Sequence, residues 1–288
     1  MLSGGGEYVS SGGEAAAALV ASDGSLEVAR GGRAIGATIE AGGAETILAG
    51  GLASRTLLSG GLQYDYGHAS NTVIRSGGRE LVERLGIASG SVISNGGSEI
   101  VSSGAIAEAT TVSAGGALLV VSGGLVTSGL TLEGGVATLS GTTAAGQIVR
   151  FAGASAELQL SNLAGFHAQI SGMNAIGQKL DLGGFVYSST ETAVWSQTGT
   201  SGTLTITDGA RKAVLDLIGT YVSSDFHLAT DSAGGTFVDD PRTSPAAVRF
   251  AAAIAGFSGR DTGLATVHNG GMSLTNALPL ATAATSGR

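Results

Sequence analysis

Cysteine is absent from this 288-residue sequence, and charged residues are scarce at 12%, against about 25% in typical globular domains. The absence of cysteine excludes thiol catalysis, disulfide bonds and cysteine-ligated zinc. The net charge is −8, no cluster of lysine or arginine occurs, and the first 150 residues contain no lysine. Because phosphate groups are bound by basic patches, we expect neither nucleic acid nor an anionic membrane as a partner.

Long apolar runs are also missing. No stretch of 18 apolar residues occurs, so the sequence predicts no membrane-spanning helix. The N-terminus, Met1 to Ser3 followed by glycines, lacks the basic and apolar regions of a cleavable signal peptide. We therefore expect either export by another route or a chain that is a fragment. The apolar spacing typical of helices is absent from the first 150 residues.

Glycine, by contrast, is abundant and regularly spaced. The chain has 50 glycines, and from Gly4 to about Gly153 they follow a repeat. A glycine that precedes a short apolar segment returns every 17 to 19 residues, at Gly5, Gly24, Gly43, Gly61, Gly78, Gly97, Gly116 and Gly135. A fixed period of this kind is typical of repeat architectures, in which each unit packs only on its neighbours.

Two apolar columns run through the repeats. Four positions after each anchor the residues are Val9, Val28, Ile47, Asp65, Val82, Val101, Val120 and Leu139. Four positions before the next anchor they are Val20, Ile39, Leu57, Ile74, Ile93, Val112 and Thr131. Short β-branched segments between glycine turns favour strands, and equal spacing stacks each column at roughly 4.8 Å per rung. The sequence predicts an all-β fold, a parallel β-helix (β-solenoid) of about 19-residue repeats with a C-terminal β cap.

The fourth repeat is irregular. It has only 17 residues, and Asp65 occupies a column position that is apolar in the other repeats. Tyr64 and Tyr66 are two positions apart, which places them on one face of a strand. A register slip would either bury the tyrosines as a packing variant or present them beside Asp65 and His68. In the second case these four residues form a candidate sugar-binding site, with stacking on the rings and hydrogen bonds at their edge.

Acidic residues also recur at a fixed offset. Glu80 and Glu99 share the offset of Glu7 and Glu45. Like charges stacked on adjacent rungs repel if they are buried, so we expect an outer column and not a catalytic pair. The sequence has no paired carboxylates with a positioned base, no metal-ligand spacing of histidines and no calcium-loop spacing of aspartates. We therefore expect no enzyme activity, no metal and no cofactor.

The repeat unit resembles the AIDA-type strand-loop-strand repeat of bacterial autotransporter passenger domains. It consists of a turn, Gly-Gly, a short strand, a second glycine turn and Thr-Val or Thr-Ile. The segment from Ile93 to Val101, ISNGGSEIV, shows the pattern, which covers about the first half of the chain. The resemblance implies an extracellular β-helical adhesin, with Ser or Thr residues to which a glycosyltransferase attaches heptose.

The period is lost from about Ala154. Residues 1–154 are therefore predicted to form the solenoid. Alternating apolar segments in 155–240, with a hairpin turn at Asp208-Gly209, predict a β-rich cap. Residues 241–288 are predicted to hold a short helix, Ala246 to Phe257, and a flexible small-residue tail similar to a type I secretion signal.

These features predict a secreted or surface-displayed bacterial protein, extracellular or on the cell surface, that mediates attachment or matrix formation. The expected partners are a host or abiotic surface, glycans or matrix polymers. Two alternatives stay open at this point. One is a carbohydrate-active or carbohydrate-binding β-helix centred on the Tyr64 repeat, and the other is a passive stalk for a partner domain that this chain lacks.

Overall fold

The computed structural model describes residues 1–239, 266–268 and 271–273. The chain divides into two compact units, Met1–Arg242 and Thr243–Arg288. The first unit contains all of the candidate functional residues.

In the second unit, strand β32 (Thr266–His268) pairs antiparallel with β33 (Gly271–Ser273). The helix predicted from Ala246 to Phe257 lies outside the described residues. Most of the predicted tail lies outside them as well, so both stay predictions.

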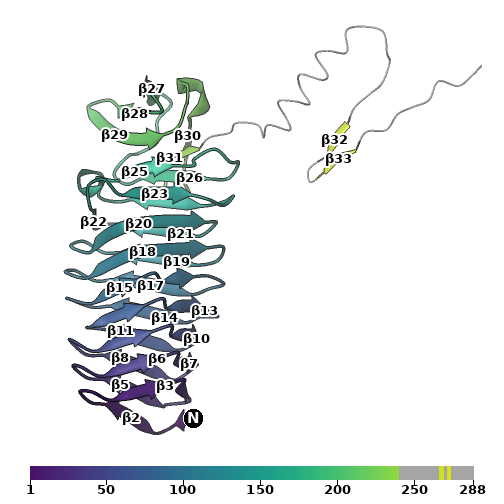
Figure 1. Ribbon diagram of the computed structural model, residues 1–288. Helices are drawn as coiled ribbons and strands as arrows, with labels where there is room; N and C mark the ends of the chain where they lie inside the picture. Colours follow the sequence, from purple (N-terminus) through teal and green to yellow (C-terminus); the bar gives the residue numbers. More distant parts are fainter. Residues whose placement is uncertain (240–265, 269–270, 274–288) are drawn as a thin grey trace, which may run out of the picture. The chain divides into compact units, whose positions relative to one another are not determined.

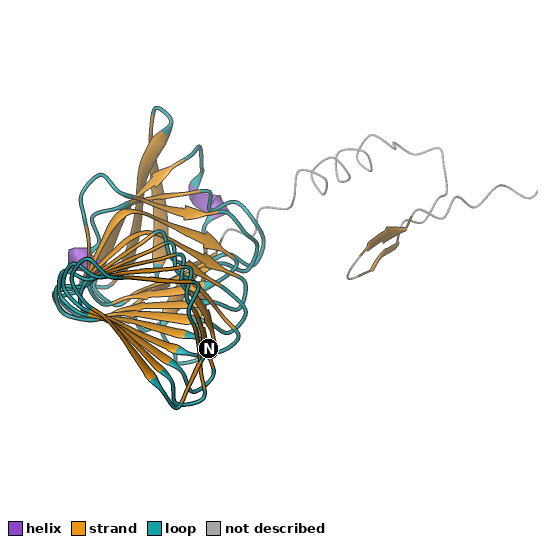
Figure 2. Ribbon diagram, turned by 60° about the horizontal axis from the view of Figure 1, so that its bottom comes forward, coloured by secondary structure: helices purple, strands orange, loops and turns teal. Residues whose placement is uncertain are grey.

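The first unit is a β-solenoid, which confirms the predicted fold class (Figure 1). A regular rung, meaning one turn of the solenoid, contains three short strands, for example β14 (Arg79–Val82), β15 (Ile87–Ser89) and β16 (Val92–Ile93). Each strand pairs in parallel with its equivalents in the rungs below and above. Seen from the end, the stacked rungs enclose a narrow interior (Figure 2). The backbone N–H and C=O groups of one rung thus form hydrogen bonds with those of the next rung, and the apolar columns pack against one another in the interior.

One wall of the solenoid is a twelve-stranded sheet. Ten of its strands stack in parallel: β2 (Gly6–Val9), β5 (Ser25–Val28), β8 (Ala44–Ile47), β11 (Leu62–Asp65), β14, β17 (Ser98–Val101), β19 (Ala117–Val120), β21 (Val136–Leu139), β24 (Glu157–Leu160) and β26 (Lys179–Leu182). The last two strands, β31 (Thr236–Asp239) and β30 (His227–Thr230), are antiparallel.

The other two walls belong to a nineteen-stranded sheet that bends within each rung. The strands of its solenoid part are β1 (Leu2–Ser3), β3 (Glu14–Ala16), β4 (Leu19–Ala21), β6 (Arg33–Ile35), β7 (Thr38–Glu40), β9 (Leu52–Ser54), β10 (Leu57–Ser59), β12 (His68–Ser70), β13 (Val73–Arg75), β15, β16, β18 (Ile106–Ser113), β20 (Leu125–Glu133), β22 (Thr142–Thr143), β23 (Ile148–Phe151) and β25 (Gln169–Ser171). At the bend, one residue per rung adopts a left-handed backbone conformation, as at Arg55 (φ 56°), Asn71 (φ 54°) and Ala109 (φ 52°).

The first predicted column is confirmed as an interior ladder. Val101 is fully buried and lies in register between Val82 and Val120, which are also fully buried. The second column is confirmed except at two positions. Leu58 is the buried residue of the third rung in place of Leu57, because the turn before Gly61 is one residue shorter than its neighbours. In the seventh rung Leu130 and Leu132 are buried, and Thr131 points outward.

The stacked rungs continue past the predicted boundary at residue 154. Strand β24 lies in parallel register on β21, and β26 lies in parallel register on β24. The equivalent residues Ala137, Leu158 and Leu180 are all buried. These rungs need 21 and 22 residues, because longer turns separate the strands, so the sequence period disappears although the stacking does not.

Antiparallel strands then cover the last rung, as the sequence predicts for a cap. Strands β27 (Thr192–Thr198), β28 (Ser201–Asp208) and β29 (Arg211–Ile218) form a meander whose second hairpin turns at the predicted Asp208-Gly209. Strand β31 pairs with β26, and β30 pairs with β31, so the last parallel strand of the twelve-stranded sheet is covered and β30 forms the edge on this side. The described residues also include two short 3-10 helices, η1 (Leu163–Gly165) and η2 (Ser223–Asp225). None of the helices in the described part of the chain is long and apolar enough to span a membrane.

An aromatic cluster supports this cap. Trp195, Tyr221 and Phe226 are each buried to at least nine-tenths, and their ring centroids lie 5.1 to 5.8 Å apart. Rings at such separations in edge-to-face and tilted arrangements contribute to packing beyond the area that they bury. The cap is therefore packed by aromatic rings that continue the hydrophobic core of the solenoid.

Candidate functional site

The four residues of the predicted sugar site do not face the same way. Strand β11 keeps the register of its neighbours, with Asp65 opposite Ile47 and Val82, so the predicted register slip does not occur. Asp65 is fully buried, which corrects its assignment to an exposed ligand site. Tyr64 points outward and is half-buried, and Tyr66 follows the strand and is 41% exposed.

His68 lies on a different wall from Tyr64. It begins strand β12 of the nineteen-stranded sheet and is half-buried between Leu52 and Ile87 in an outward-facing column. The two tyrosines therefore remain near one another on the surface. Asp65 is inside, and His68 belongs to the next wall.

The fourth rung is short because its turn is short. Only Tyr66 and Gly67 connect β11 to β12, whereas four residues make the same turn in the next rung. The Asp65 carboxylate accepts a hydrogen bond from the Gly67 amide at 3.0 Å. A Cβ atom on Gly67 would lie 2.5 Å from the Leu48 carbonyl oxygen and 2.6 Å from that of Gly51. The tight turn thus requires glycine at position 67, and the buried Asp65 carboxylate accepts the hydrogen bond of the Gly67 amide.

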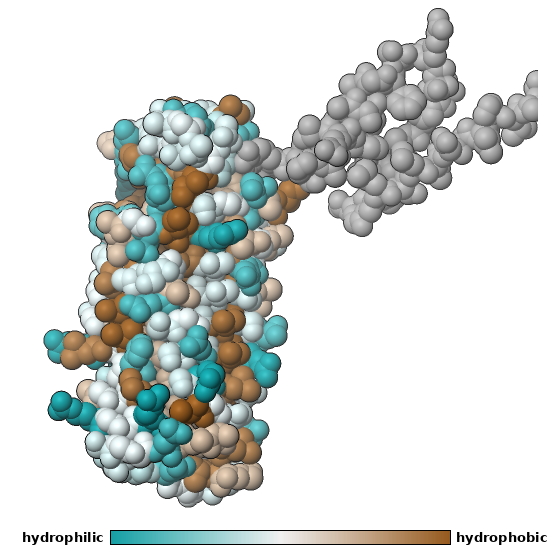
Figure 3. Space-filling view, viewed as in Figure 1, coloured by the Kyte–Doolittle hydropathy of each residue, from teal (hydrophilic) through white to brown (hydrophobic). Residues whose placement is uncertain are grey.

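Tyr64 belongs to an outward-facing column of the twelve-stranded sheet, which we call the outer apolar column. Its members are in direct register on four successive rungs: Tyr64, Leu81, Ile100 and Leu119. The first three are half-buried, and Leu119 is 38% exposed. Hydrophobic residues reach the surface at several points along the solenoid, interspersed with hydrophilic ones (Figure 3).

The acidic column predicted to lie outside is inside. Glu45, Glu80 and Glu99 are fully buried, and Gln63 occupies the same column between Glu45 and Glu80. Only Glu7, in the first rung, is partly exposed. We call Glu45, Gln63, Glu80 and Glu99 the interior polar ladder. The expectation of an outer column is wrong, because it assumed that the carboxyl groups are charged.

Hydrogen bonds connect most of this ladder. Gln63 Nε2 donates to Glu45 Oε2 at 2.6 Å, and the Thr56 hydroxyl donates to the same oxygen at 3.0 Å. The Ser91 hydroxyl donates to Glu80 Oε2 at 3.0 Å. Thr72 Oγ1 lies 3.3 Å from Gln63 Oε1 and 3.2 Å from Glu80 Oε1. Neither oxygen of Glu99 has a hydrogen-bond partner among the described residues.

Burial shifts these acids toward their neutral form. It raises the pKa of Glu45 to about 7, that of Asp65 to about 7 and that of Glu99 to about 8. Burial, together with the nearby Glu99 and Asp65, raises the pKa of Glu80 well above its ordinary value. Transfer of an ionised carboxylate into an apolar interior is so unfavourable that the group binds a proton instead. Protonation removes the mutual repulsion and supplies donors to the ladder.

The same four rungs carry a buried hydroxyl after the bend. These hydroxyl residues are Thr56, Thr72, Ser91 and Thr110. In the rungs just outside the ladder both positions are apolar: Leu26 with Ala37 below, and Leu118 with Leu130 above. Rungs three to six therefore have polar residues at both positions, whereas rungs two and seven have them at neither. This pairing is the sequence signal that identifies the column as an interior one.

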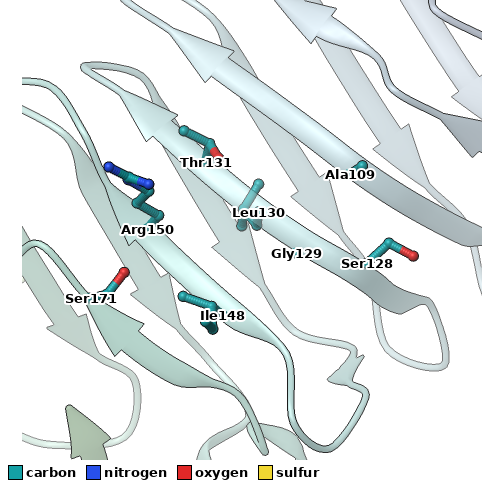
Figure 4. A pocket seen from close by; sticks show the side chains of 8 residues that line it. All are labelled: Ala109, Ser128, Gly129, Leu130, Thr131, Ile148, Arg150 and Ser171. Atoms are coloured by element: carbon teal, nitrogen blue, oxygen red, sulfur yellow. The ribbon is translucent and has the colours of Figure 1, made fainter. Parts of the chain in front are cut away.

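A groove lies on the nineteen-stranded sheet, near its upper end. Arg150 points outward from β23, in register between Thr131 of β20 and Ser171 of β25 (Figure 4). On one side of it is a hollow of about 290 Å³, and on the other side is one of about 540 Å³. Ile148, Arg150 and Ser171 line both hollows. We call this feature the Arg150 groove.

The groove arises where the repeat changes. Strand β20 has one residue more than β18 at the bend, and the register shifts there between Glu108 and Thr110. The extra backbone at Ser128 and Gly129 borders the smaller hollow. Sequence reasoning missed Arg150, although its alternation with the buried Val149 and Phe151 indicates an outward-facing cation in a solenoid that has few.

A metal site is not found in the described part of the chain. No group of three or more His, Asp or Glu side chains there is arranged to hold a metal ion. The interior polar ladder includes four carboxyl or amide side chains, but they are stacked along the axis, and Glu45, Gln63 and Glu80 bond to hydroxyls or to each other.

Known proteins match this chain weakly or not at all. No family model and no curated protein matches the chain. A solved structure that is similar to it is the TibC-catalysed hyper-glycosylated TibA fragment 55–350, with a TM-score of 0.40 and 24% identity. The match covers 65% of this chain and 86% of the fragment. Similarity at this level does not transfer a function.

Proposed function

We propose that this chain is an adhesive β-solenoid displayed outside a bacterial cell, where it attaches to a surface or to matrix polymers. The observation that carries the proposal is the outer apolar column of Tyr64, Leu81, Ile100 and Leu119. The fold repeats one kind of contact at a constant spacing of roughly 4.8 Å along a rigid wall. A surface partner then meets several equivalent side chains at once.

The energetics suit attachment through many weak contacts. Each half-exposed aliphatic side chain adds only a fraction of the ~1.5–3 kcal/mol that full burial gives. Linked contacts on one rigid body nevertheless reinforce one another, because after the first contact the others form within the same complex. Few charged residues, 12% of the chain, leave this contact largely insensitive to salt. Such a wall holds extended surfaces better than single small molecules.

Glycosylation is a second part of the proposal. The repeat resembles AIDA-type passenger domains, and hydroxyl residues at exposed turns, such as Ser103 and Ser122, are accessible to a glycosyltransferase. The mass of the intact protein from its native host tests this directly. Added heptose masses support the proposal, and an unmodified mass contradicts it.

Binding to beads tests the adhesive surface. The chain, fluorescently labelled, is applied to polystyrene beads and to glycan-coated beads, and the retained fraction is measured after washing. The triple variant Leu81→Ser/Ile100→Ser/Leu119→Ser is expected to lower retention several-fold, because it removes three linked contacts.

The neighbouring wall offers a matched control. Ile87, Ile106 and Leu125 form a second outward-facing apolar column, on the nineteen-stranded sheet. Their triple serine variant binds like the wild type if retention belongs to the outer apolar column alone, and it loses retention if both columns attach. If wild-type chain is not retained on any bead, the adhesive function is wrong and the stalk is the better explanation. If only the variant Tyr64→Ala/Tyr66→Ala loses binding, and only on glycan beads, the partner is a sugar and not an apolar surface.

A further inference from the structure

We propose that the Arg150 groove binds the carboxylate of an acidic saccharide, such as a uronic acid within a polysaccharide. This inference does not depend on the adhesive function, because the groove lies on the nineteen-stranded sheet and the outer apolar column lies on the other one. The argument rests on three properties of the groove: an unpaired cation, hydroxyls on both sides of it, and an apolar surface beside it.

The cation has no internal partner. Arg150 is exposed, and no carboxylate of the described residues lies within salt-bridge distance of its guanidinium. No other charged side chain lines either hollow. A guanidinium presents two parallel N–H donors that match a carboxylate, and such charge-assisted pairs are among the stronger hydrogen bonds.

The surroundings fit a sugar ring. Thr131 and Ser171 flank Arg150 in direct register on the two adjacent strands, so a hydroxyl side chain stands on either side of the guanidinium (Figure 4). Ile148, two residues earlier on the same strand, is 41% exposed and offers an apolar contact for the C–H face of a ring. Asn174 lines the larger hollow with an amide.

Size and charge distinguish this ligand from others. Hollows of about 290 and 540 Å³ lie near the lower end of the ~300–1,000 Å³ typical of small-molecule sites, so one or two sugar units fit on either side of Arg150. A single cation matches a carboxylate of charge −1 better than a phosphate. Nucleic acid binding requires several cations and stacking aromatics, which the groove lacks.

The test compares an acidic saccharide with its neutral form. Trigalacturonic acid and its methyl ester are titrated into the full chain, and binding is measured by calorimetry and by NMR chemical-shift changes. We expect weak, saturable binding of the free acid and roughly tenfold or more weaker binding of the ester, as for loss of a charge-assisted bond. Arg150→Gln is expected to weaken binding of the acid by a similar factor.

Arg75 provides the matched control. It is an exposed arginine on the same sheet, four rungs below Arg150, and it lines neither hollow. Arg75→Gln removes the same charge and is expected to leave binding unchanged. Equal weakening by both variants, or equal binding of acid and ester, overturns the proposal. If a triglutamate peptide binds as tightly as the sugar acid, the groove recognises carboxylates without a preference for saccharides, and the assignment to sugar is wrong.

Discussion

Replacing Glu99 with glutamine is expected to make the solenoid more stable at alkaline pH and to leave it unchanged at acid pH. Glu99 is fully buried at the upper end of the interior polar ladder, and neither of its oxygens has a hydrogen-bond partner among the described residues. Glutamine has nearly the same size and shape, but it does not ionise. The substitution therefore removes one property of the side chain, its negative charge at high pH.

The magnitude follows from the shift in the pKa of Glu99. Burial raises it from 4.5 to about 8. Between these values the folded chain binds more protons at this residue than the unfolded chain, so the free energy of unfolding falls as the pH rises. The stabilisation by the neutral acid is complete below about pH 4.5 and is lost by about pH 8. At 1.36 kcal/mol per pKa unit, the loss is on the order of 5 kcal/mol for this group.

Denaturant unfolding at about pH 4 and about pH 9 measures the effect. Wild type and Glu99→Gln are expected to differ little at the lower pH, whereas the variant is expected to be several kcal/mol more stable at the higher pH. Glu40→Gln makes the same chemical change on an exposed residue and is expected to alter stability by less than about 0.5 kcal/mol at either pH. If Glu99→Gln shifts stability equally at both pH values, Glu99 is not a buried neutral acid.

Two further substitutions test the packing of the rungs. Val101→Asp places a carboxyl in the buried ladder between Val82 and Val120. It is expected to cost several kcal/mol, because transfer of a carboxyl group into an apolar interior is strongly unfavourable. Ile100→Asp, which faces outward on the same strand, is expected to cost far less, and similar melting temperatures for the two variants would show the column assignment to be wrong. Gly67→Ala drives a Cβ atom against two carbonyl oxygens and is expected to lower the free energy of unfolding by about 1–3 kcal/mol. Gly5→Ala, with open space around the added Cβ atom, is expected to be nearly neutral. Equal melting temperatures of these two alanine variants would contradict the tight turn.

The fold was predictable because the same pattern of glycines and apolar residues occurs in many successive repeats. Each repeat independently places an apolar residue at the position of Val101, and the single exception, Asp65, does not obscure the column. Errors entered where one turn changed length. Leu58 and not Leu57 is buried because a single residue is missing from the following turn, and spacing from an anchor glycine cannot show on which side of a strand a residue was lost.

The interior acids were predicted on the wrong face for a different reason. Pattern alone places Glu80 and Glu99 at inward positions, next to the ladder of Val82 and Val101 with one residue between. These two glutamates were nevertheless predicted to face outward, because their carboxyl groups were assumed to be charged. Protonation depends on the environment, which the sequence does not state. The hydroxyls at Thr72 and Ser91 were the available signal, since they occur only in rungs with a polar side chain in the ladder.

The Arg150 groove was beyond sequence reasoning because it arises from an irregularity. One extra residue at the bend of β20 changes the local register, and the effect of such an insertion on a surface depends on how neighbouring strands adjust. The cap boundary was misplaced for a related reason. Longer turns hide the period after Ala154, while the strands that they connect keep stacking.

The two-residue turn of the fourth rung has a consequence for how such a gene changes over generations. Two residues are absent there relative to the next rung, yet β11 and β14 stay in register, so a small deletion is absorbed where it occurs. A whole rung is absorbed equally well, because each rung contacts only its neighbours. Unequal recombination between the similar DNA segments that encode the rungs therefore lengthens or shortens the protein in steps of roughly 4.8 Å per rung. The length of the solenoid is then a heritable quantity that varies without loss of folding.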